Sequence, residues 1–227
     1  MTEITIIILT KNEEGNIEWV IDELKSLNLN NIIVVDAGST DNTVQILKSK
    51  NIKHFIQSQK GYGAAILEAV SKVDTKYLSV IDADGSYDSR DIPKMLNILK
   101  THDLDFVLGS RYLAGNKSDD DTLIRLIGNF FFTKLTRIIF NINITDALFH
   151  FPVCKTTSYQ RLNLKFKDFA ICVEMPVMIN ENNLKFKEFF SKERPRMTCE
   201  SKVNALKDGI KILYQILKLF YLQKIKS

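Results

Sequence analysis

Tyr77-Leu78-Ser79-Val80-Ile81-Asp82-Ala83-Asp84-Gly85 is an apolar run that ends in two carboxylates separated by one residue. Side chains at positions i and i+2 of an extended segment leave on the same face, so Asp82 and Asp84 are expected to converge just beyond a strand. Two carboxylates that close repel each other unless a cation or a proton lies between them. A hard cation such as Mg²⁺ or Mn²⁺, held by one or two carboxylates and by substrate phosphates, meets that requirement. The pair therefore predicts a metal site for a phosphate-bearing substrate, with a solvated acidic turn as the alternative.

The composition is that of an ordinary globular protein. The 227 residues fit one α/β domain, with or without a tail, better than two domains. The net charge of +4 is too small to indicate nucleic-acid binding, so no nucleic-acid partner is expected. Cys154, Cys172 and Cys199 are isolated and odd in number, which argues against a disulfide framework or a structural zinc site. No run of 18 apolar residues occurs and the N-terminus lacks a basic leader, so a cytoplasmic protein is predicted, with membrane contact confined to its surface.

Short apolar runs alternate with amphipathic segments through the first half of the chain. The predicted strands are Ile4–Leu9, Ile32–Val35, Lys53–Ile56, Tyr77–Ile81 and Asp105–Leu108. The predicted helices between them are Glu14–Leu27, Thr43–Lys50, Gly63–Ser71 and Ser89–Lys100. Strands of nearly continuous Ile and Val that alternate with helices are typical of a parallel sheet covered on both faces. The expected fold class is therefore α/β.

Polar residues follow four of these strands at their carboxyl ends. They are Thr10-Lys11-Asn12-Glu13, Asp36-Ala37-Gly38-Ser39, Asp82-Ala83-Asp84 and Gly109-Ser110-Arg111. Ligands of parallel sheets bind beyond the carboxyl ends of the strands. Because sheet packing alone does not explain four polar strand ends at one edge, a binding site is predicted there.

Two helical patterns in the second half carry wide apolar faces. Leu123–Phe140 is predicted to be either a core helix or a helix in contact with lipid. Val203–Lys224 has an apolar stripe that includes Ile210, Leu213 and Leu217, opposite several lysines. Such a helix suits an anionic membrane surface, and it also suits docking on the protein's own core or on a second copy in a homo-oligomer. We predict one domain over residues 1–200 and an amphipathic helical tail over residues 201–227.

Five sequence blocks occur in the order found in a known family. They are Thr10-Lys11-Asn12-Glu13-Glu14-Gly15-Asn16-Ile17, Val35-Asp36-Ala37-Gly38-Ser39-Thr40-Asp41-Asn42-Thr43, Gly61-Tyr62-Gly63-Ala64-Ala65, Asp82-Ala83-Asp84-Gly85-Ser86-Tyr87-Asp88 and Gly109-Ser110-Arg111-Tyr112. Together they resemble the family 2 glycosyltransferases of GT-A fold, and most closely the dolichyl- or polyprenyl-phosphate mannose synthases. The resemblance implies a GT-A (Rossmann-like), mostly parallel central sheet with helices on both faces, plus the C-terminal amphipathic helix.

The resemblance also implies a nucleotide-sugar donor, GDP- or UDP-linked, and a divalent metal, Mg²⁺ or Mn²⁺. The implied nucleotide-sugar-binding residues are Thr10, Asn12, Glu13, Asp36, Gly38, Ser39, Gly63, Asp82, Ala83 and Asp84. Among them, Glu13 and Asp36 would accept hydrogen bonds from the nucleobase and the ribose. The implied metal site consists of Asp82, Asp84 and Ser86, the last standing where the synthases often have Gln. The metal would act as a Lewis acid that stabilises the leaving nucleoside diphosphate.

A polyprenyl phosphate is the acceptor that the resemblance implies. A phosphate monoester is already an anionic nucleophile, so the protein must supply position and positive charge more than a general base. Arginine suits that task because its guanidinium pairs two phosphate oxygens at once. The implied acceptor-phosphate-binding residues are Arg111, Arg125, Asn129, Arg196 and Lys202, with Arg194 as a competitor for the role of Arg196. The implied catalytic residues are Asp82, Asp84, Arg111 and Arg125.

The predicted function is inverting transfer of a hexose, mannose from GDP-mannose first of all, to a polyprenyl or dolichyl phosphate at the cytoplasmic face of a membrane. One alternative is a family 2 transferase that uses a UDP-sugar and a hydroxyl acceptor, for which Asp146 is the candidate general base. Another is a nucleotide-binding module without catalysis, against which the paired aspartates argue. The chain departs from the synthase pattern at His150, Pro152 and Cys199, all on the acceptor side.

Overall fold

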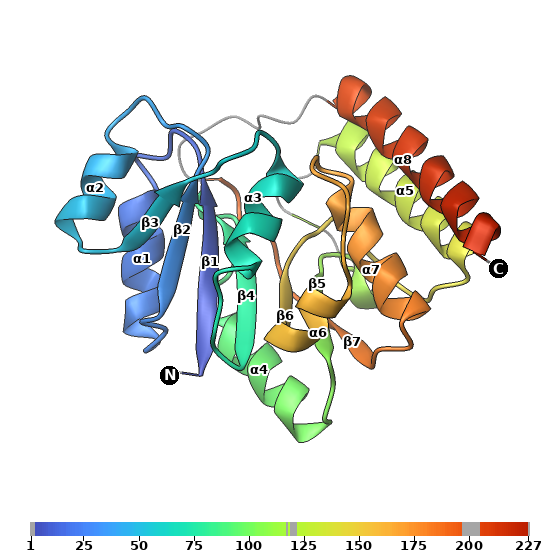
Figure 1. The fold of residues 1–227 in the computed structure, drawn as a ribbon, viewed down its shortest axis with the longest axis horizontal. Helices are drawn as coiled ribbons and strands as arrows, with labels where there is room; N and C mark the ends of the chain where they lie inside the picture. The colour runs from blue at the N-terminus through green and yellow to red at the C-terminus, as the bar shows by residue number, and fades with distance from the viewer. Residues whose placement is uncertain (1–2, 117, 119–121, 197–204, 227) are drawn as a thin grey trace.

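The central element of the protein is a twisted sheet. The computed structural model describes residues 3–116, 118, 122–196 and 205–226, and in the last range it places the side chains of residues 209–222. The described strands are β1 (Ile4–Thr10), β2 (Ile32–Asp36), β3 (Lys53–Ile56), β4 (Tyr77–Asp82), β5 (Phe106–Ser110), β6 (Pro152–Lys155) and β7 (Phe186–Phe190). They form one 7-stranded sheet in the order β3-β2-β1-β4-β6-β5-β7 (Figure 1). All neighbouring strands run parallel except where β6 takes part, so the predicted mostly parallel α/β sheet is confirmed.

Helices cover both faces of the sheet because its central strands are apolar on both sides. Ile4, Ile6 and Ile8 of β1 point into one core, whereas Ile7 and Leu9 point into the other. The first core contains residues of α1 (Ile17–Ser26), α2 (Thr43–Ser49) and α4 (Asp91–Thr101). The second contains residues of α3 (Tyr62–Val70), α6 (Thr156–Arg161) and α7 (Ile171–Glu181).

Strand β6, like β7, was not among the strands predicted from the sequence. It lies between β4 and β5 and is antiparallel to both. A proline within a short apolar run argues against a strand, because proline cannot donate a ladder hydrogen bond. Pro152 avoids that conflict by occupying the first position of β6, opposite Leu108 of β5. The antiparallel pairs that β6 forms with β4 and β5 are the part of the sheet that is not parallel.

The point where the strand order reverses lies between β1 and β4. From β1 the chain builds outward through β2 and β3 on one side, and β4 begins the other side. Leu9 is in register with Asp82, and the Ala83 amide donates to the Leu9 carbonyl oxygen at 3.0 Å. In open α/β sheets the crevice beyond this reversal point is where ligands bind. The acidic pair is thus carried to the position where the topology predicts a site.

Helices α5 (Leu123–Phe140) and α8 (Ala205–Lys226) lie side by side at one end of the molecule (Figure 1). Ile212, Ile216 and Leu219 of α8 join the hydrophobic core, while Ile210 and Leu217 of the predicted stripe are exposed. Helix α8 is therefore apolar both toward the core and toward solvent. Within the described residues, no helix combines the length and apolar character that crossing a bilayer would require.

Candidate active site

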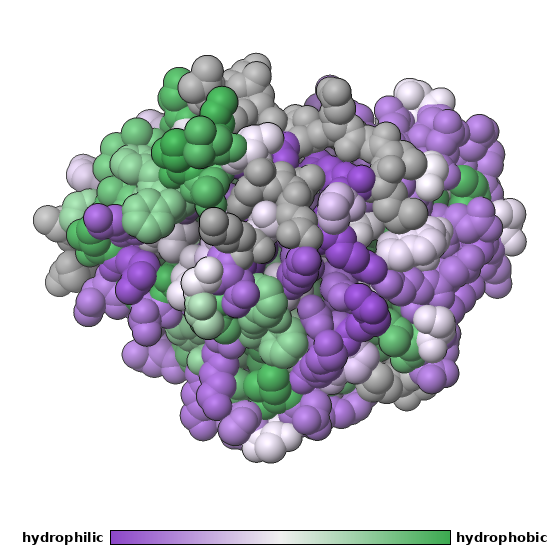
Figure 2. Space-filling model, turned by 180° about the vertical axis from the view of Figure 1, so that it is seen from behind, coloured by the Kyte–Doolittle hydropathy of each residue, from purple (hydrophilic) through white to green (hydrophobic). Residues whose placement is uncertain are grey.

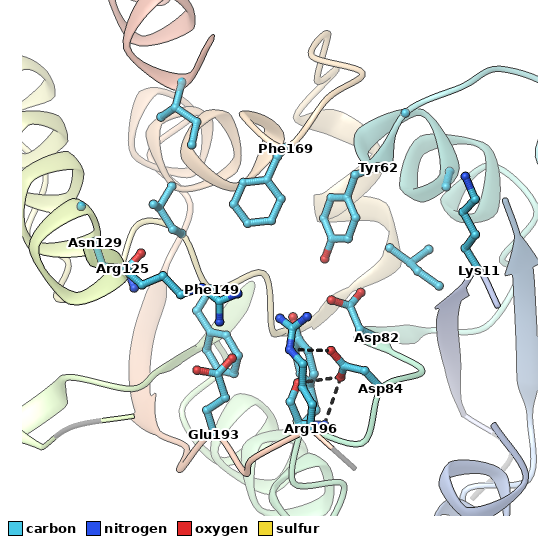
Figure 3. Close-up of a pocket in the computed structure, with 18 of the residues that line it drawn as sticks. Lys11, Tyr62, Asp82, Asp84, Arg125, Asn129, Phe149, Phe169, Glu193 and Arg196 are labelled. Atoms are coloured by element: carbon cyan, nitrogen blue, oxygen red, sulfur yellow. Dashed lines mark hydrogen bonds and ion pairs between the residues drawn. The ribbon is translucent and has the colours of Figure 1, made fainter. Parts of the chain in front are cut away.

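A cavity of about 920 Å³ extends from the carboxyl ends of β1 and β4 to the helix pair α5 and α8 (Figure 3). Its sheet end is lined by Leu9, Thr10, Lys11, Glu13, Val35, Ala37, Gln57, Lys60 and Tyr62. Its centre is lined by Asp82, Ala83, Asp84, Ser86, Tyr87, Arg111, Phe149, Glu193 and Arg196. Its helical end is lined by Ile124, Arg125, Ile127, Gly128, Asn129, Phe131, Phe132, Ile210, Ile212 and Leu213. One cavity thus joins charged residues at the sheet edge to an apolar region between two helices.

The acidic pair forms the centre of the site. Asp84 lies in the turn after β4, in which Gly85 has a φ of 78°. Oδ1 of Asp84 accepts hydrogen bonds from the Ser86 amide at 3.0 Å and from the Ser86 hydroxyl at 2.7 Å. Its Oδ2 lies 3.3 Å from Nε of Arg196. Oδ1 of the neighbouring Asp82 and the hydroxyl oxygen of Thr10 are both buried, and neither has a hydrogen-bond partner among the described residues. Buried oxygens without protein partners at a cavity wall are available to a bound ion, water or ligand.

The two carboxylates cannot both be charged without help. Burial and then the charge of Asp84 raise the pKa of Asp82 to about 8, whereas a hydrogen bond from Tyr62 and the charge of Arg196 act in the opposite direction. The Tyr62 hydroxyl points toward Asp82 in the cavity (Figure 3). A divalent cation would offset both the burial and the repulsion that raise the pKa of Asp82.

The carboxylate oxygens of Asp82 and Asp84 fit a hard cation whose other ligands come from a bound substrate and from water. Among the described residues there is no group of three or more His, Cys, Asp or Glu side chains that could hold a metal ion. An ion held by Asp82 and Asp84 would therefore be completed by phosphate oxygens and water, as is common for Mg²⁺. Ser86, predicted as a third ligand, lines the cavity and also supports Asp84 through two hydrogen bonds.

The predicted nucleotide-binding residues after β1 and β2 divide into two groups. Thr10 and Glu13 line the cavity. The other group, Asn12, Asp36, Gly38 and Ser39, forms a network that joins the two loops and does not line the cavity. Asp36 accepts from the amides of Gly38 and Ser39 at 2.9 Å each and from the Ser39 hydroxyl, so its carboxylate is occupied by its own turn. Direct contact between Asp36 and a nucleobase stays a prediction.

Gly63, also predicted to bind the donor, lies in the first turn of α3. A Cβ at this position would lie 2.3 Å from the Phe166 carbonyl oxygen and 2.9 Å from that of Asp168. The glycine is therefore required for the close approach of α3 to the chain before α7, and it does not line the cavity. Its role in donor binding stays a prediction.

Arg111, predicted to bind the acceptor phosphate, is held by two carboxylates. Its Nε and Nη2 donate to Asp146 at 2.7 and 3.0 Å, and its Nη1 donates to Glu193 at 3.2 Å. Burial alone would lower the pKa of Arg111, but the charge and hydrogen bonds of Asp146 and the charge of Glu193 raise it well above the usual value. Arg111 lines the cavity as part of this cluster. Asp146, the candidate base, has a fully buried side chain that accepts from Arg111 with both oxygens, so it is not positioned to take a proton from a substrate.

The other predicted phosphate-binding residues come from α5 and from the chain after β7. Arg125 and Asn129 line the cavity from α5, and Asn129 donates to the Tyr112 hydroxyl at 2.7 Å. Arg194 and Arg196, the two candidates for one phosphate-binding role, lie in different surroundings. Arg194 pairs with Glu23 at 2.9 Å and lies over the Trp19 ring outside the cavity, whereas Arg196 lies at Asp84 (Figure 3). Lys202 lies outside the described residues.

Two of the departures from the synthase pattern have structural roles. His150 is buried and its Nε2 lies 3.2 Å from the Tyr159 hydroxyl, and burial lowers its pKa to about 3. Pro152 begins β6, as described above. Neither residue lines the cavity. Cys199 lies outside the described residues.

The sequence prediction did not include several cavity residues, among them Glu193, Tyr62 and Phe149. Glu193 accepts from Arg111 and from the Ser118 hydroxyl. Phe149 stacks on Tyr87 with ring centroids 4.9 Å apart. Only Tyr62 lay within a recognised block, between Gly61 and Gly63. Glu193 and Phe149 reach the site through long-range packing, which no local pattern indicates.

The structure is similar to solved structures of the GT-A class. Glucosyl-3-phosphoglycerate synthase from Mycobacterium tuberculosis in complex with UDP superposes with a TM-score of 0.75 at 15% identity, covering 96% of this chain and 79% of that one. The complex of the same enzyme with Mn²⁺, UDP and glucosyl-3-phosphoglycerate gives a TM-score of 0.72 at 17% identity, covering 95% of this chain and 78% of that one. At these identities the likeness concerns the fold, and it confirms the predicted GT-A architecture.

Sequence comparison then identifies the family. Residues 5–162 match the family described as Glycosyl transferase family 2, and the chain belongs to that family. The chain is 28% identical over 212 residues to the low-salt glycan biosynthesis hexosyltransferase Agl6 of Haloferax volcanii, a match that covers 91% of this chain but only 51% of Agl6. It is 28% identical over 244 residues to the UDP-N-acetylglucosamine–dolichyl-phosphate N-acetylglucosaminyltransferase of Methanococcus voltae, with 95% of each chain covered. The predicted family is therefore confirmed.

Proposed function

We propose that the protein is a metal-dependent, inverting glycosyltransferase that moves a hexose from a nucleotide-sugar to a polyprenyl phosphate. The observation that carries the proposal is the single cavity in which the acidic pair and an apolar region meet. A nucleoside diphosphate with a divalent cation suits the first end, and a lipid chain suits the second. A lipid phosphate has both the charge and the apolar chain that this cavity would accommodate.

The donor would bind at the sheet end of the cavity. Lys11 and Lys60 line this end and supply positive charge for phosphates, while Glu13 offers acceptor oxygens for a nucleobase or ribose. A divalent cation on Asp82 and Asp84 would supply Lewis-acid stabilisation of the leaving diphosphate. We retain GDP-mannose as the first donor to test. A UDP-sugar is the second, because the dolichyl-phosphate transferase of Methanococcus voltae is named for UDP-N-acetylglucosamine.

The acceptor would bind between the acidic pair and the helical end. An oxygen of the acceptor phosphate would form the new bond to the anomeric carbon of the sugar, while the bond from that carbon to the diphosphate oxygen breaks. Arg125 from α5 and Arg196 from the chain after β7 both line the cavity (Figure 3), and they would position the phosphate and balance its charge. The lipid chain would continue along apolar residues of α5 and α8, such as Ile127 and Phe131. The phosphate needs little help from a general base, which agrees with the buried position of Asp146.

Turnover assays would test this function. Purified protein with Mn²⁺ is expected to transfer sugar from GDP-mannose, or from one of a panel of UDP-sugars, to a polyprenyl phosphate and not to free saccharides. Transfer to a free saccharide or a peptide hydroxyl without transfer to polyprenyl phosphate would contradict the acceptor. A donor preference for UDP would replace the GDP-mannose assignment and leave the acceptor class in place.

We further propose that the outer surface of α5 and α8 contacts the cytoplasmic face of a membrane. Large apolar side chains gather there, as Figure 2 shows for the face opposite to that of Figure 1. The exposed ones are Leu123, Ile124, Ile127, Phe130, Phe131, Ile138, Ile210, Tyr214, Leu217, Tyr221 and Leu222. Lys134, Arg137, Lys211 and Lys218 are exposed on the same two helices. Apolar residues flanked by basic ones are the composition that binds the interface of an anionic bilayer.

A double substitution, Phe130→Asp with Leu217→Asp, is expected to lower binding to anionic vesicles by about tenfold or more, because it removes apolar contact and adds negative charge. Neither residue lines the cavity. Ile56→Asp is the matched control, because Ile56 is 66% exposed on β3 at the other end of the sheet. Co-sedimentation with vesicles would measure the effect. Equal sedimentation of all three proteins would contradict membrane binding by this surface. A dimer in analytical ultracentrifugation that the double substitution dissociates would show that the surface binds a second copy of the chain instead.

A further inference from the structure

One side chain already holds a positive charge against the acidic pair. Nε of Arg196 lies 3.3 Å from Oδ2 of Asp84, on the side of the carboxylate that Ser86 does not occupy. Only 22% of the Arg196 side chain and 10% of the Asp84 side chain are exposed. An ion pair this shielded from water is screened less than one at the surface.

The backbone that carries Arg196 is anchored next to the turn after β4. The Arg194 amide donates to the Ser86 carbonyl oxygen at 2.8 Å. The Arg194 side chain is fixed from the other side by Glu23, by the Trp19 ring and by the Tyr87 carbonyl oxygen. This clamp holds the chain two residues before Arg196 against the loop that contains Asp84. Arg196 is thereby kept within reach of the acidic pair, whichever anion its guanidinium contacts.

We propose that Arg196 and a divalent cation compete for Asp84, so that Arg196 neutralises this carboxylate in the metal-free protein and turns to a phosphate group of a bound ligand once a cation takes Asp84. The inference rests on the proposed function, which supplies the cation and the phosphate. A guanidinium and a divalent cation repel each other, so each weakens the binding of the other at the same carboxylate. Phosphate is the alternative partner because a guanidinium pairs with its oxygens as well as it pairs with a carboxylate.

The exchange sets an order of binding. Before cation and donor bind, Arg196 is engaged at Asp84 and is not available to an acceptor phosphate. After they bind, its charge faces the cavity where the two phosphate-bearing substrates meet. Coupling between two sites is reciprocal, so whatever strengthens the contact between Arg196 and Asp84 must weaken cation binding by the same factor.

Mn²⁺ binding in the absence of substrates tests the competition without using turnover. The free Mn²⁺ signal in electron paramagnetic resonance would give dissociation constants for the native protein, Arg196→Gln, Arg196→Lys and Arg125→Gln. Arg125→Gln is the matched control, because it removes the same charge from another residue that lines the same cavity. Arg196→Gln is expected to bind Mn²⁺ at least about fivefold more tightly than the control, at the lower end of typical couplings between sites.

Arg196→Lys keeps the charge but loses the planar guanidinium, so its Mn²⁺ affinity is expected to fall between those of the native protein and Arg196→Gln. It also gives a second measurement if Arg196→Gln folds poorly. Mn²⁺ binding by Arg196→Gln that is no tighter than by Arg125→Gln would overturn the exchange and leave the metal site in place. Failure of every protein to bind Mn²⁺ would overturn the metal site, and with it both the proposed function and this inference.

Discussion

Asp84→Asn is expected to lower kcat/KM by about 10²–10³-fold or more, since removing a single preorganised electrostatic contact to a transition state has effects of this size. Asp84 is held by Ser86 at its Oδ1, which leaves Oδ2 directed toward Arg196 and, in the proposed mechanism, toward the cation. An amide keeps this shape but removes the charge that would hold a divalent cation. Mn²⁺ affinity should therefore fall together with turnover.

Asp103→Asn is the matched control for this experiment. Asp103 is exposed, lies near the opposite end of the sheet and has a φ of 45°, which asparagine tolerates. The turnover and the Mn²⁺ affinity of the Asp103→Asn variant should equal those of the native protein. If Asp84→Asn kept native turnover and native Mn²⁺ affinity, the metal-dependent mechanism would be wrong.

Gly63→Ala is expected to destabilise the protein by about 2–4 kcal/mol, although alanine normally stabilises a helix relative to glycine. The new Cβ would lie 2.3 Å from one backbone carbonyl oxygen and 2.9 Å from another. Those carbonyls cannot easily move, because Glu174 accepts from the Lys165 and Phe166 amides at 2.8 Å each and the Ala64 amide donates to the Lys167 carbonyl oxygen at 3.0 Å. For a chain of this size the loss corresponds to a fall in Tm of roughly 5–15 °C.

Gly128→Ala is the control that separates this clash from general helix propensity. Gly128 lies within α5, and a Cβ there would have no atom within 4 Å. The substitution should raise stability by about 0.5–1 kcal/mol, the usual advantage of alanine in a helix. Thermal unfolding of both variants would measure the contrast. A Gly63→Ala protein as stable as the native one would show that the chain before α7 can move away from α3.

The strands and helices of the first half, and helix α5 of the second half, could be predicted because each is specified by its own residues. Strand β1 is apolar at almost every position, and helix α5 begins and ends at the residues that its apolar pattern indicates. Strand β6 could not be predicted in this way, because four residues that begin with Pro152 form a strand only through pairing with β4 and β5. Pairing partners 44 to 78 residues away leave no local periodicity to read.

The candidate site shows the same division. The sequence by itself determined that Asp82 and Asp84 stand at the tip of a buried strand, because alternation along an extended chain is a local property. Only the tertiary structure decided which side chains contact these two residues and the other predicted site residues. It directs Arg196 and not Arg194 to Asp84, occupies Asp36 within its own turn, and holds Arg111 between Asp146 and Glu193. Such partnerships depend on which distant segments meet and on which charges are buried there, and both are properties of the packed chain rather than of any one stretch of it.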